Sequence, residues 1–174
     1  MGDPRKIRKK FNTPSHPWRA ERIQEEHKLA QEYGLKNMRE IWKGKTLLAN
    51  VAHQTKKLIA LHTEQADVEK KQLLGRLASL GLLPATAALT DVLSLTVKDI
   101  LNRRLQTILV QRKLARTPKQ ARQFITHEHI QVKNKVISSP SYIVSKEEEE
   151  TISFISSSAL NDISHPERAI RGKK

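Results

Sequence analysis

The apolar residues in the first hundred positions recur every three or four residues, the period of an α-helix. This pattern predicts one helix that begins near Pro17 and ends before Gly34, and a second that runs from Asn37 into the sixties. A third is predicted over 67–80, followed by Gly81, because glycine readily adopts the left-handed conformation that ends many helices. The N-terminal part of the chain is therefore expected to be helical.

Beyond residue 95 the pattern changes from helical to alternating. Thr96 and Thr117 are each suited to cap a helix, and Pro118 occupies a favoured first helical position. The apolar spacing from Val97 onward predicts one continuous helix up to the break at "LARTP". The short runs "HIQV", "KVI", "SYIV" and "TISFI" then predict strands, with a turn at Lys133–Asn134 whose register is left open.

Hydrophobic residues make up 37% of the 174 positions and aromatic residues only 4%. A core must therefore be built from Leu, Ile, Val and Ala, and two small subdomains are expected rather than one large core. The predicted fold class is α+β and mostly helical. The predicted divisions are a basic arm over 1–16, a helical subdomain over 17–101, a helix–turn–helix followed by a small antiparallel sheet over 102–150, and a C-terminal strand with a basic tail over 151–174.

Positive charge is concentrated in residues 101–145. The whole chain has 32 Lys and Arg against 18 Asp and Glu, a net charge of +14, which attracts polyanions and above all nucleic acid. Residues 101–145 contain a single acidic residue, Glu128. Their basic residues are Arg103, Arg104, Arg112, Lys113, Arg116, Lys119, Arg122, Lys133 and Lys135.

A second basic cluster lies at the N-terminus, where five cations face one acid, Asp3. Such a block repels itself in solution and is expected to become ordered only against a phosphate-rich partner. It consists of Arg5, Lys6, Arg8, Lys9 and Lys10.

The helix predicted from Pro118 separates apolar from polar residues. Ala121, Phe124 and Ile125 share one face at helical spacing. Cations and neutral hydrogen-bonding groups together suit a nucleic-acid backbone, the cations for affinity and the neutral groups for phosphate, ribose or base edges. Composition does not decide between DNA and RNA. The opposite face carries Lys119, Arg122, Gln123 and Thr126.

The segment "RRLQTILVQRKLARTPKQARQFITHEHIQVKNKVISSPSYIV", residues 103–144, resembles the S-four RNA-binding domain. The matching features are Arg-Leu on a first helix, Ala-Arg on a second, an Ile-x-Val strand, a turn, and Pro-Ser-Tyr-x-Val. The segments "GDPRKIRKKFNTPSHPW", "YGLKNMREIWK" and "GLLP" extend the resemblance to the archaeal–eukaryotic form of the S-four family of small-subunit ribosomal proteins. The resemblance implies direct binding of small-subunit rRNA, a role in nucleating subunit assembly, and neighbouring ribosomal proteins as partners.

The resemblance also implies which residues contact RNA. They come from both helices of the domain, the junction between them, the bend after the second helix and the hairpin. They are Arg103, Arg104, Arg116, Thr117, Lys119, Gln120, Arg122, Gln123, His127, His129, Lys133 and Lys135; Arg112 and Lys113 join them through the charge pattern.

The stretch "ITHEHIQV" could also hold a metal, because His127, Glu128 and His129 offer three possible ligands. The spacing is not the i, i+4 pair of a helical zinc site, and the other histidines form no complementary set. We therefore expect no metal and no cofactor. At least one of the two histidines is expected to contact RNA, with capping of the helix C-terminus as the alternative, and Glu128 is expected to tether a nearby Arg or Lys.

No enzymatic motif was found. There is no cysteine, no Gly-x-Ser-x-Gly elbow and no glycine-rich phosphate loop, so we expect a structural protein without a small-molecule substrate. An RNA-modifying enzyme with an S-four module and a free RNA-binding regulator remain the alternatives. No apolar run is long enough for a membrane span, so the expected location is the cytoplasm, where the resemblance implies a place in the ribosome.

Two further expectations concern single features. Trp18 and Trp42 occupy apolar helical positions, so they are expected to pack in a core or between subdomains rather than stack on bases. The run "KEEEE", residues 146–150, is expected to be a solvated loop.

Overall fold

The computed structural model describes residues 2, 9–84, 86–162 and 165–167. Residues 1 and 3–8 of the predicted arm, which include Arg5, Lys6 and Arg8, lie outside this part of the chain, as do residues 163–164 and 168–174 of the predicted C-terminal strand and tail. The helices are α1 (Ala20–Glu32), α2 (Met38–Ala60), α3 (Glu64–Ser79), α4 (Leu89–Val92), α5 (Val97–Asn102), α6 (Leu105–Gln111), α7 (Pro118–Thr126) and α8 (Lys146–Glu150). The strands are β1 (Ile130–Val132), β2 (Lys135–Val136) and β3 (Ser153–Phe154), and a 3-10 turn, η1, covers Ala159–Asn161.

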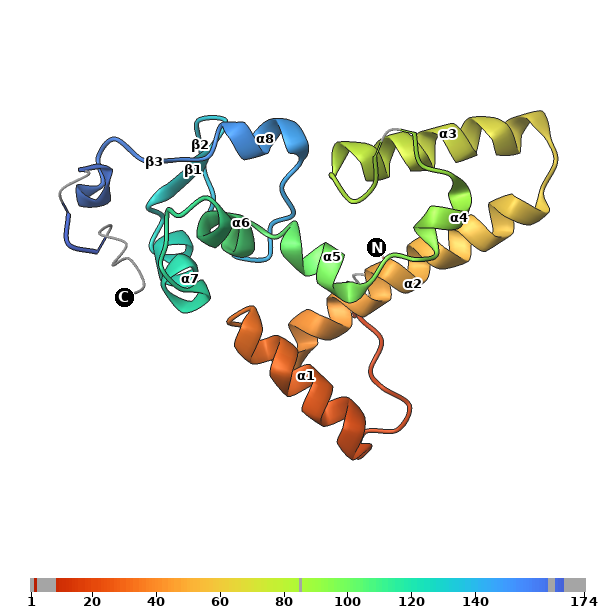
Figure 1. Cartoon of the computed structure of the whole chain (residues 1–174), viewed down its shortest axis with the longest axis horizontal. Coiled ribbons are helices and arrows are strands. Elements are labelled where there is room, and N and C mark those ends of the chain that lie inside the picture. The colour runs from red at the N-terminus through yellow and green to blue at the C-terminus, as the bar shows by residue number, and fades with distance from the viewer. Residues whose placement is uncertain (1, 3–8, 85, 163–164, 168–174) are drawn as a thin grey trace.

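The predicted α+β, mostly helical fold is confirmed (Figure 1). Its buried hydrophobic residues form two clusters. The smaller cluster joins α2, α3 and α4 and includes Leu58, Leu73 and Leu77. The larger one joins α6, α7 and the sheet, and its aliphatic residues are supplemented by Phe124 and Phe154. Among the described residues, no helix is long and apolar enough to cross a membrane.

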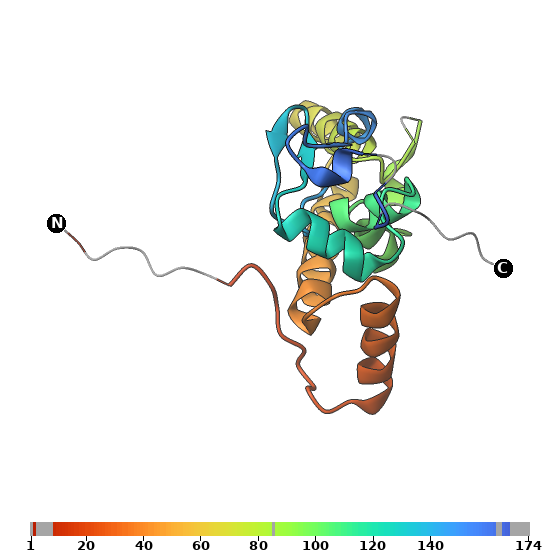
Figure 2. The same ribbon diagram turned by 90° about the vertical axis from the view of Figure 1, so that its left-hand side faces the viewer.

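Helix α2 is the central element of the N-terminal half. It packs against α1, α3, α4 and α5, and Figures 1 and 2 show it running lengthwise through this half of the molecule. Its buried residues Ile41, Gly44, Thr55 and Leu58 fall on the face that these neighbours share. Helix α5 lies between α2 and α6 and thereby links the two clusters.

The small sheet has the strand order β2-β1-β3, and both pairs are antiparallel. Lys133 and Asn134 have φ values of 47° and 63°, which allow the tight turn between β1 and β2. Val132 therefore lies opposite Lys135, and the register left open by the sequence is defined. Val136 is exposed, as the pleat of a strand requires when its neighbour Ile137 packs on the core.

The continuous helix predicted from Val97 is wrong, because the chain breaks between α5 and α6. Arg104 is extended and forms a β-bridge with Ile143. The Leu105 N–H donates to the Tyr142 carbonyl at 2.8 Å. The apolar spacing continues across the break, so periodicity alone could not reveal this pairing with a distant segment.

The start of the first helix was also predicted wrongly. Helix α1 begins at Ala20, with Arg19 as its N-cap, and Trp18 precedes the helix with 89% of its surface exposed. Trp42 follows the prediction better: it is half-buried on α2, and its ring lies 6.0 Å from that of Phe11. The prediction of core packing therefore fails for Trp18 alone.

The run "KEEEE" is helix α8 rather than a loop. Ser145 caps it: the Glu148 N–H donates to the Ser145 hydroxyl at 3.3 Å, and the Ser145 N–H donates to the Glu148 carboxylate at 3.1 Å. Within the described ranges the neighbouring run "SYIV" forms no strand beyond the bridge at Ile143.

Replacing Gly34 with alanine should lower the free energy of unfolding by about 1–3 kcal/mol, measured by denaturant titration. Gly34 has a φ of +60°, and an added Cβ would lie 2.7 Å from the Pro118 Cβ at the start of α7. The matched control is Gly75→Ala in α3, where a Cβ would meet open space; it should stabilise the chain by roughly 0.5–1 kcal/mol. Equal stabilities of Gly34→Ala and the unaltered chain would contradict this close approach.

Candidate nucleic-acid interface

Helix α7 forms as its sequence predicts. The Thr117 hydroxyl caps it by accepting the Gln120 N–H at 3.2 Å, and Pro118 is its first residue. Ala121, Phe124 and Ile125 are buried in the larger cluster. The helix is thus fixed on one side and leaves its polar face outward.

Most of the predicted RNA-contacting residues are exposed and the others form bonds within the chain, while some, such as Arg116, do both. Lys119 and Gln123 lie exposed on the outer face of α7. The exposed predicted residues around them come from the end of α6, the junction, the bend and the hairpin. They are Arg112, Lys113, Arg116, Thr117, His127, Lys133 and Lys135.

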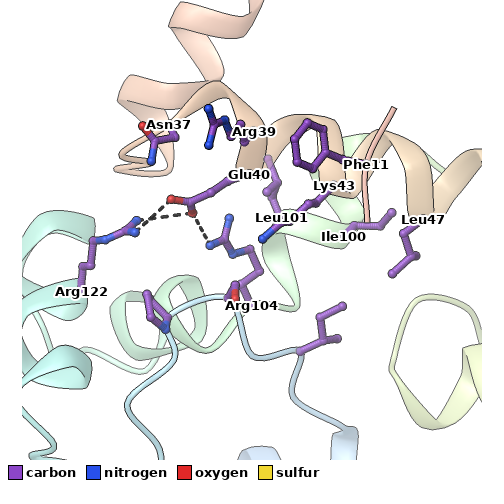
Figure 3. A pocket seen from close by; sticks show the side chains of 14 residues that line it. Phe11, Asn37, Arg39, Glu40, Lys43, Leu47, Ile100, Leu101, Arg104 and Arg122 are labelled. Carbon is purple, nitrogen blue, oxygen red and sulfur yellow. Dashed lines mark hydrogen bonds and ion pairs between the residues drawn. The ribbon is translucent and has the colours of Figure 1, made fainter. Parts of the chain in front are cut away.

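Arg104 and Arg122 lie in the other group, because both bind Glu40 of α2 (Figure 3). The Arg104 Nη2 atom lies 2.5 Å from Glu40 Oε2, and the Arg122 Nη2 atom lies 2.9 Å from Oε1. Arg104 is only 5% exposed. Its side chain therefore holds α2 against the helix–turn–helix instead of reaching the outer surface.

The electrostatics of this Arg–Glu–Arg group favour the ionised carboxylate. Burial alone would raise the pKa of Glu40, but the hydrogen bonds and positive charges of Arg122 and Arg104 outweigh it and lower the pKa below its ordinary value. Two guanidinium groups against one carboxylate leave the group with a net positive charge.

Arg103, the residue before Arg104 in the break between α5 and α6, is also bonded within the chain. Its Nη1 atom lies 2.8 Å from Glu149 Oε2 of α8, and its Nη2 atom donates to the Val144 carbonyl at 3.0 Å. Helix α8 thus supplies the carboxylate that pairs with Arg103. The prediction of a solvated loop did not include this ion pair.

The junction before α7 contacts the C-terminal segment. Arg116 donates from its guanidinium to the Pro166 carbonyl, and Gln120 Nε2 donates to the Glu167 carboxylate at 2.8 Å. Gln120 also accepts the Arg116 N–H at 2.8 Å. Two predicted RNA-contacting side chains are therefore held by the chain itself at this edge.

The two histidines of the opening motif occupy different environments. His127 is exposed, whereas His129 is half-buried with its Nδ1 atom 3.0 Å from the Ser158 hydroxyl. In the part of the chain that the structure describes, no three His, Cys, Asp or Glu side chains are grouped to hold a metal ion. The predicted tether from Glu128 is likewise absent from the ion pairs of those residues; Glu128 has a φ of 60° at the bend.

A groove of about 510 Å³ lies between α2 and the helix–turn–helix (Figure 3). Its lining combines apolar residues such as Leu47 and Ile143 with the Glu40 group and with two cations of α2, Arg39 and Lys43. In Figure 3 the Lys43 side chain reaches toward Arg104. The groove therefore places two cations of α2 beside Arg104 and Arg122, and the sequence prediction of RNA-contacting residues included none from α2.

The N-terminal arm contributes two described cations. Lys9 and Lys10 are exposed where the chain approaches α2. Asn12 follows them and donates its N–H to the Thr46 hydroxyl at 2.9 Å, which anchors this end of the arm.

Comparisons with known proteins agree with this geometry. The family model "S4 domain" matches residues 103–150, which include α6, α7, β1, β2 and α8. The chain is 50% identical over 169 residues to small ribosomal subunit protein uS4 of Methanococcus aeolicus, covering 97% of this chain and 96% of that protein. It is 48% identical over 160 residues to the uS4 protein of Methanothermobacter thermautotrophicus, covering 92% and 94%, and 50% identical over 154 residues to that of Ignicoccus hospitalis, covering 88% and 93%.

The helix–turn–helix, the hairpin and this match define an S-four-domain protein. Because the similarity extends over almost the full length of its relatives, the chain belongs to the uS4 family of small-subunit ribosomal proteins. The predicted resemblance is thereby confirmed. The family consists of ribosomal proteins rather than enzymes, so the prediction that the chain is not an enzyme is confirmed as well.

Proposed function

We propose that this chain is a structural constituent of the small ribosomal subunit and binds small-subunit rRNA directly. Family membership supports the first part, because the matched relatives are named as proteins of that subunit. The single observation that carries the second part is the exposed group of cations on and around α7, which has no described carboxylate partner except Glu147 near Lys133.

The proposed interface consists of the exposed cations and the neutral groups between them. The cations neutralise phosphates, and Thr117, Gln123 and His127 supply hydrogen bonds to phosphate, ribose or base. Arg103, Arg104 and Arg122 act mainly by holding this surface in shape through Glu149 and Glu40. This division revises the sequence prediction, which treated all of them as equivalent contacts.

Several finer statements belong to the same proposal. The arm extends the rRNA contacts through Arg5, Lys6, Arg8, Lys9 and Lys10. The chain helps to nucleate subunit assembly, lies beside other small-subunit proteins, and works in the cytoplasm. The proposed division of the chain is a basic arm over 1–16, a helical subdomain over 17–101, the S-four domain over 102–150, and a C-terminal strand and basic tail over 151–174.

Replacing Lys119 and Lys135 together with alanine should weaken binding of a small-subunit rRNA transcript by about tenfold or more. Both lysines are exposed and absent from the ion pairs of the described residues, so their loss removes phosphate contacts without unfolding the domain. The slope of log affinity against log salt should also fall by about two, one for each lysine. Filter binding at several salt concentrations measures both quantities.

The matched control removes two exposed lysines elsewhere, Lys28 on α1 and Lys71 on α3. Their replacement with alanine makes the same change in net charge and should leave affinity and slope nearly unchanged. An equal loss in both double variants would show that only net charge matters, against a defined interface. Sedimentation of a cell extract distinguishes a ribosomal protein from a free RNA-binding regulator. A ribosomal protein should sediment with the small subunits, whereas a free regulator should not.

A further inference from the structure

Trp18 is the most exposed of the large hydrophobic side chains in the described part of the chain, at 89%. An indole group left in water forgoes the free energy that its burial would provide. The expected packing against a core does not occur, so its position needs another explanation.

The turn that carries Trp18 is held in place from within the protein. Arg22 Nη2 donates to the Pro17 carbonyl at 2.7 Å, immediately before Trp18. Arg22 Nη1 in turn donates at 2.9 Å to Glu26, which is 2% exposed. A buried carboxylate thus positions the arginine, and the arginine positions the backbone of the exposed tryptophan.

Glu26 is itself fixed from α2. Lys45 Nζ lies 2.6 Å from Glu26 Oε1, and the Trp42 indole N–H donates to Oε2 at 3.2 Å. Burial would raise the pKa of Glu26, but these bonds and the one from Arg22 lower it below its ordinary value, so the carboxylate is ionised at neutral pH. The bonds that support the turn at Trp18 therefore involve two helices, α1 and α2.

A hollow of about 280 Å³ adjoins this turn. His16 and Arg19, on either side of Trp18 in sequence, line it together with Arg22 and Lys45. Three cations line the hollow against one carboxylate, Glu26, which is already shared by three donors. The Arg22 Nε atom is buried without a hydrogen-bond partner among the described residues, while Arg19 binds Glu21 at 3.1 Å.

From this geometry we propose that Trp18 is a base-stacking residue and that the adjoining hollow receives the phosphate of the same unpaired nucleotide. The indole face supplies stacking, which any base can accept. Arg19 and Lys45, with Asn12, Thr13 and Ser15 beside them, supply donors to phosphate and ribose. This inference rests on the proposed rRNA binding and adds a second contact area, at the N-terminal end of α1 and the adjoining arm, apart from the S-four domain.

An RNA nucleotide fits these observations better than a protein segment does. An apolar protein anchor would need apolar walls beside the indole, but most residues lining the hollow are polar or cationic, with Pro14 and Trp42 as exceptions. The turn also follows directly on the basic arm through Lys9 and Lys10. Both features favour a polyanion with planar bases.

The test uses the full chain and a small-subunit rRNA transcript. Trp18→Ala should weaken binding by about tenfold, within the range for base–aromatic stacking, and Trp18→Phe should restore most of it. The slope of affinity against salt should not change, because stacking releases no counterions. Val68→Ala, which trims another exposed apolar side chain on α3, is the matched control and should bind like the unaltered chain.

Acrylamide quenching gives a direct readout. The fluorescence of the unaltered chain minus that of Trp18→Phe reports Trp18, which should be quenched freely in the free protein and protected in the rRNA complex. A fully paired RNA duplex should give no protection. Trp18 that stays open to acrylamide in the rRNA complex, or becomes protected only in assembled subunits, would overturn the inference; the second outcome would assign it to a protein neighbour.

The two proposals fail in distinguishable ways. An unaltered chain that does not bind the transcript overturns the proposed function and this inference together. A chain that binds with a steep salt dependence while Trp18→Ala matches Val68→Ala overturns this inference alone.

Discussion

Replacing Glu40 with alanine is expected to lower the free energy of unfolding by about 3–5 kcal/mol, the usual effect of removing one partner of a buried ion pair. The substitution leaves the Arg104 guanidinium charged, buried and without its carboxylate, and it releases Arg122 as well. Denaturant titration at neutral pH measures the change. Glu21→Ala is the control, because Glu21 pairs with Arg19 at the exposed surface and should leave stability nearly unchanged.

Acid should reduce the difference in the free energy of unfolding between the Glu40→Ala variant and the unaltered chain. The pKa of Glu40 is lowered from its ordinary value of 4.5, so its contribution is fully present above that pH and is lost as pH falls through the lower folded value. If this difference in stability stayed constant down to strongly acidic pH, the stability lost in Glu40→Ala would come from side-chain packing and not from the ionised carboxylate.

The affinity for small-subunit rRNA is expected to fall at least about a thousandfold between 50 and 200 mM salt. A fall of this size corresponds to roughly six phosphate contacts. The proposed interface has enough exposed cations to make these phosphate contacts. They are Arg112, Lys113, Arg116, Lys119, Lys133 and Lys135.

Filter binding or fluorescence titration across that range gives the slope. Sucrose added at constant salt is the control, because a neutral solute releases no counterions and should leave the affinity nearly unchanged. A flat salt response would remove the basis for phosphate recognition by these residues.

Local features of the fold could be predicted from the sequence. Thr117 and Pro118 define the start of α7, and Gly34 and Gly81 both have positive φ after the helices that they end. Thr96 is the N-cap of α5 as its sequence predicts, and its N–H donates to the Asp99 carboxylate at 2.8 Å. Each of these signals depends on residues within a few positions of one another, so the sequence contains all the necessary information.

Contacts between distant segments could not be predicted in the same way. The break before Leu105 exists because Tyr142 offers a backbone carbonyl, and the apolar spacing on either side gives no sign of it. The residues near Glu40 fit the apolar spacing of a helix. Nothing near Glu40 in the sequence indicates that it pairs with Arg104 and Arg122. Counting charges along residues 101–145 therefore overestimated how many cations are exposed.

Trp18 shows a different limit. Its prediction assumed that an apolar residue near a helical pattern belongs to that helix and to a core. The first turn instead begins after it, because Arg22 and Glu26 fix the preceding backbone outside the helix. The residue that sequence reasoning assigned to packing is the one that the further inference assigns to binding.

The shared carboxylate of Glu40 also determines when the nascent chain can finish folding. Glu40 precedes its partners by 64 and 82 residues. At about 5–20 residues per second, a translating ribosome adds 82 residues in roughly 4–16 s. Glu40 therefore gains Arg104 first and Arg122 only after that interval, so the Arg–Glu–Arg group is complete only once α7 has left the exit tunnel.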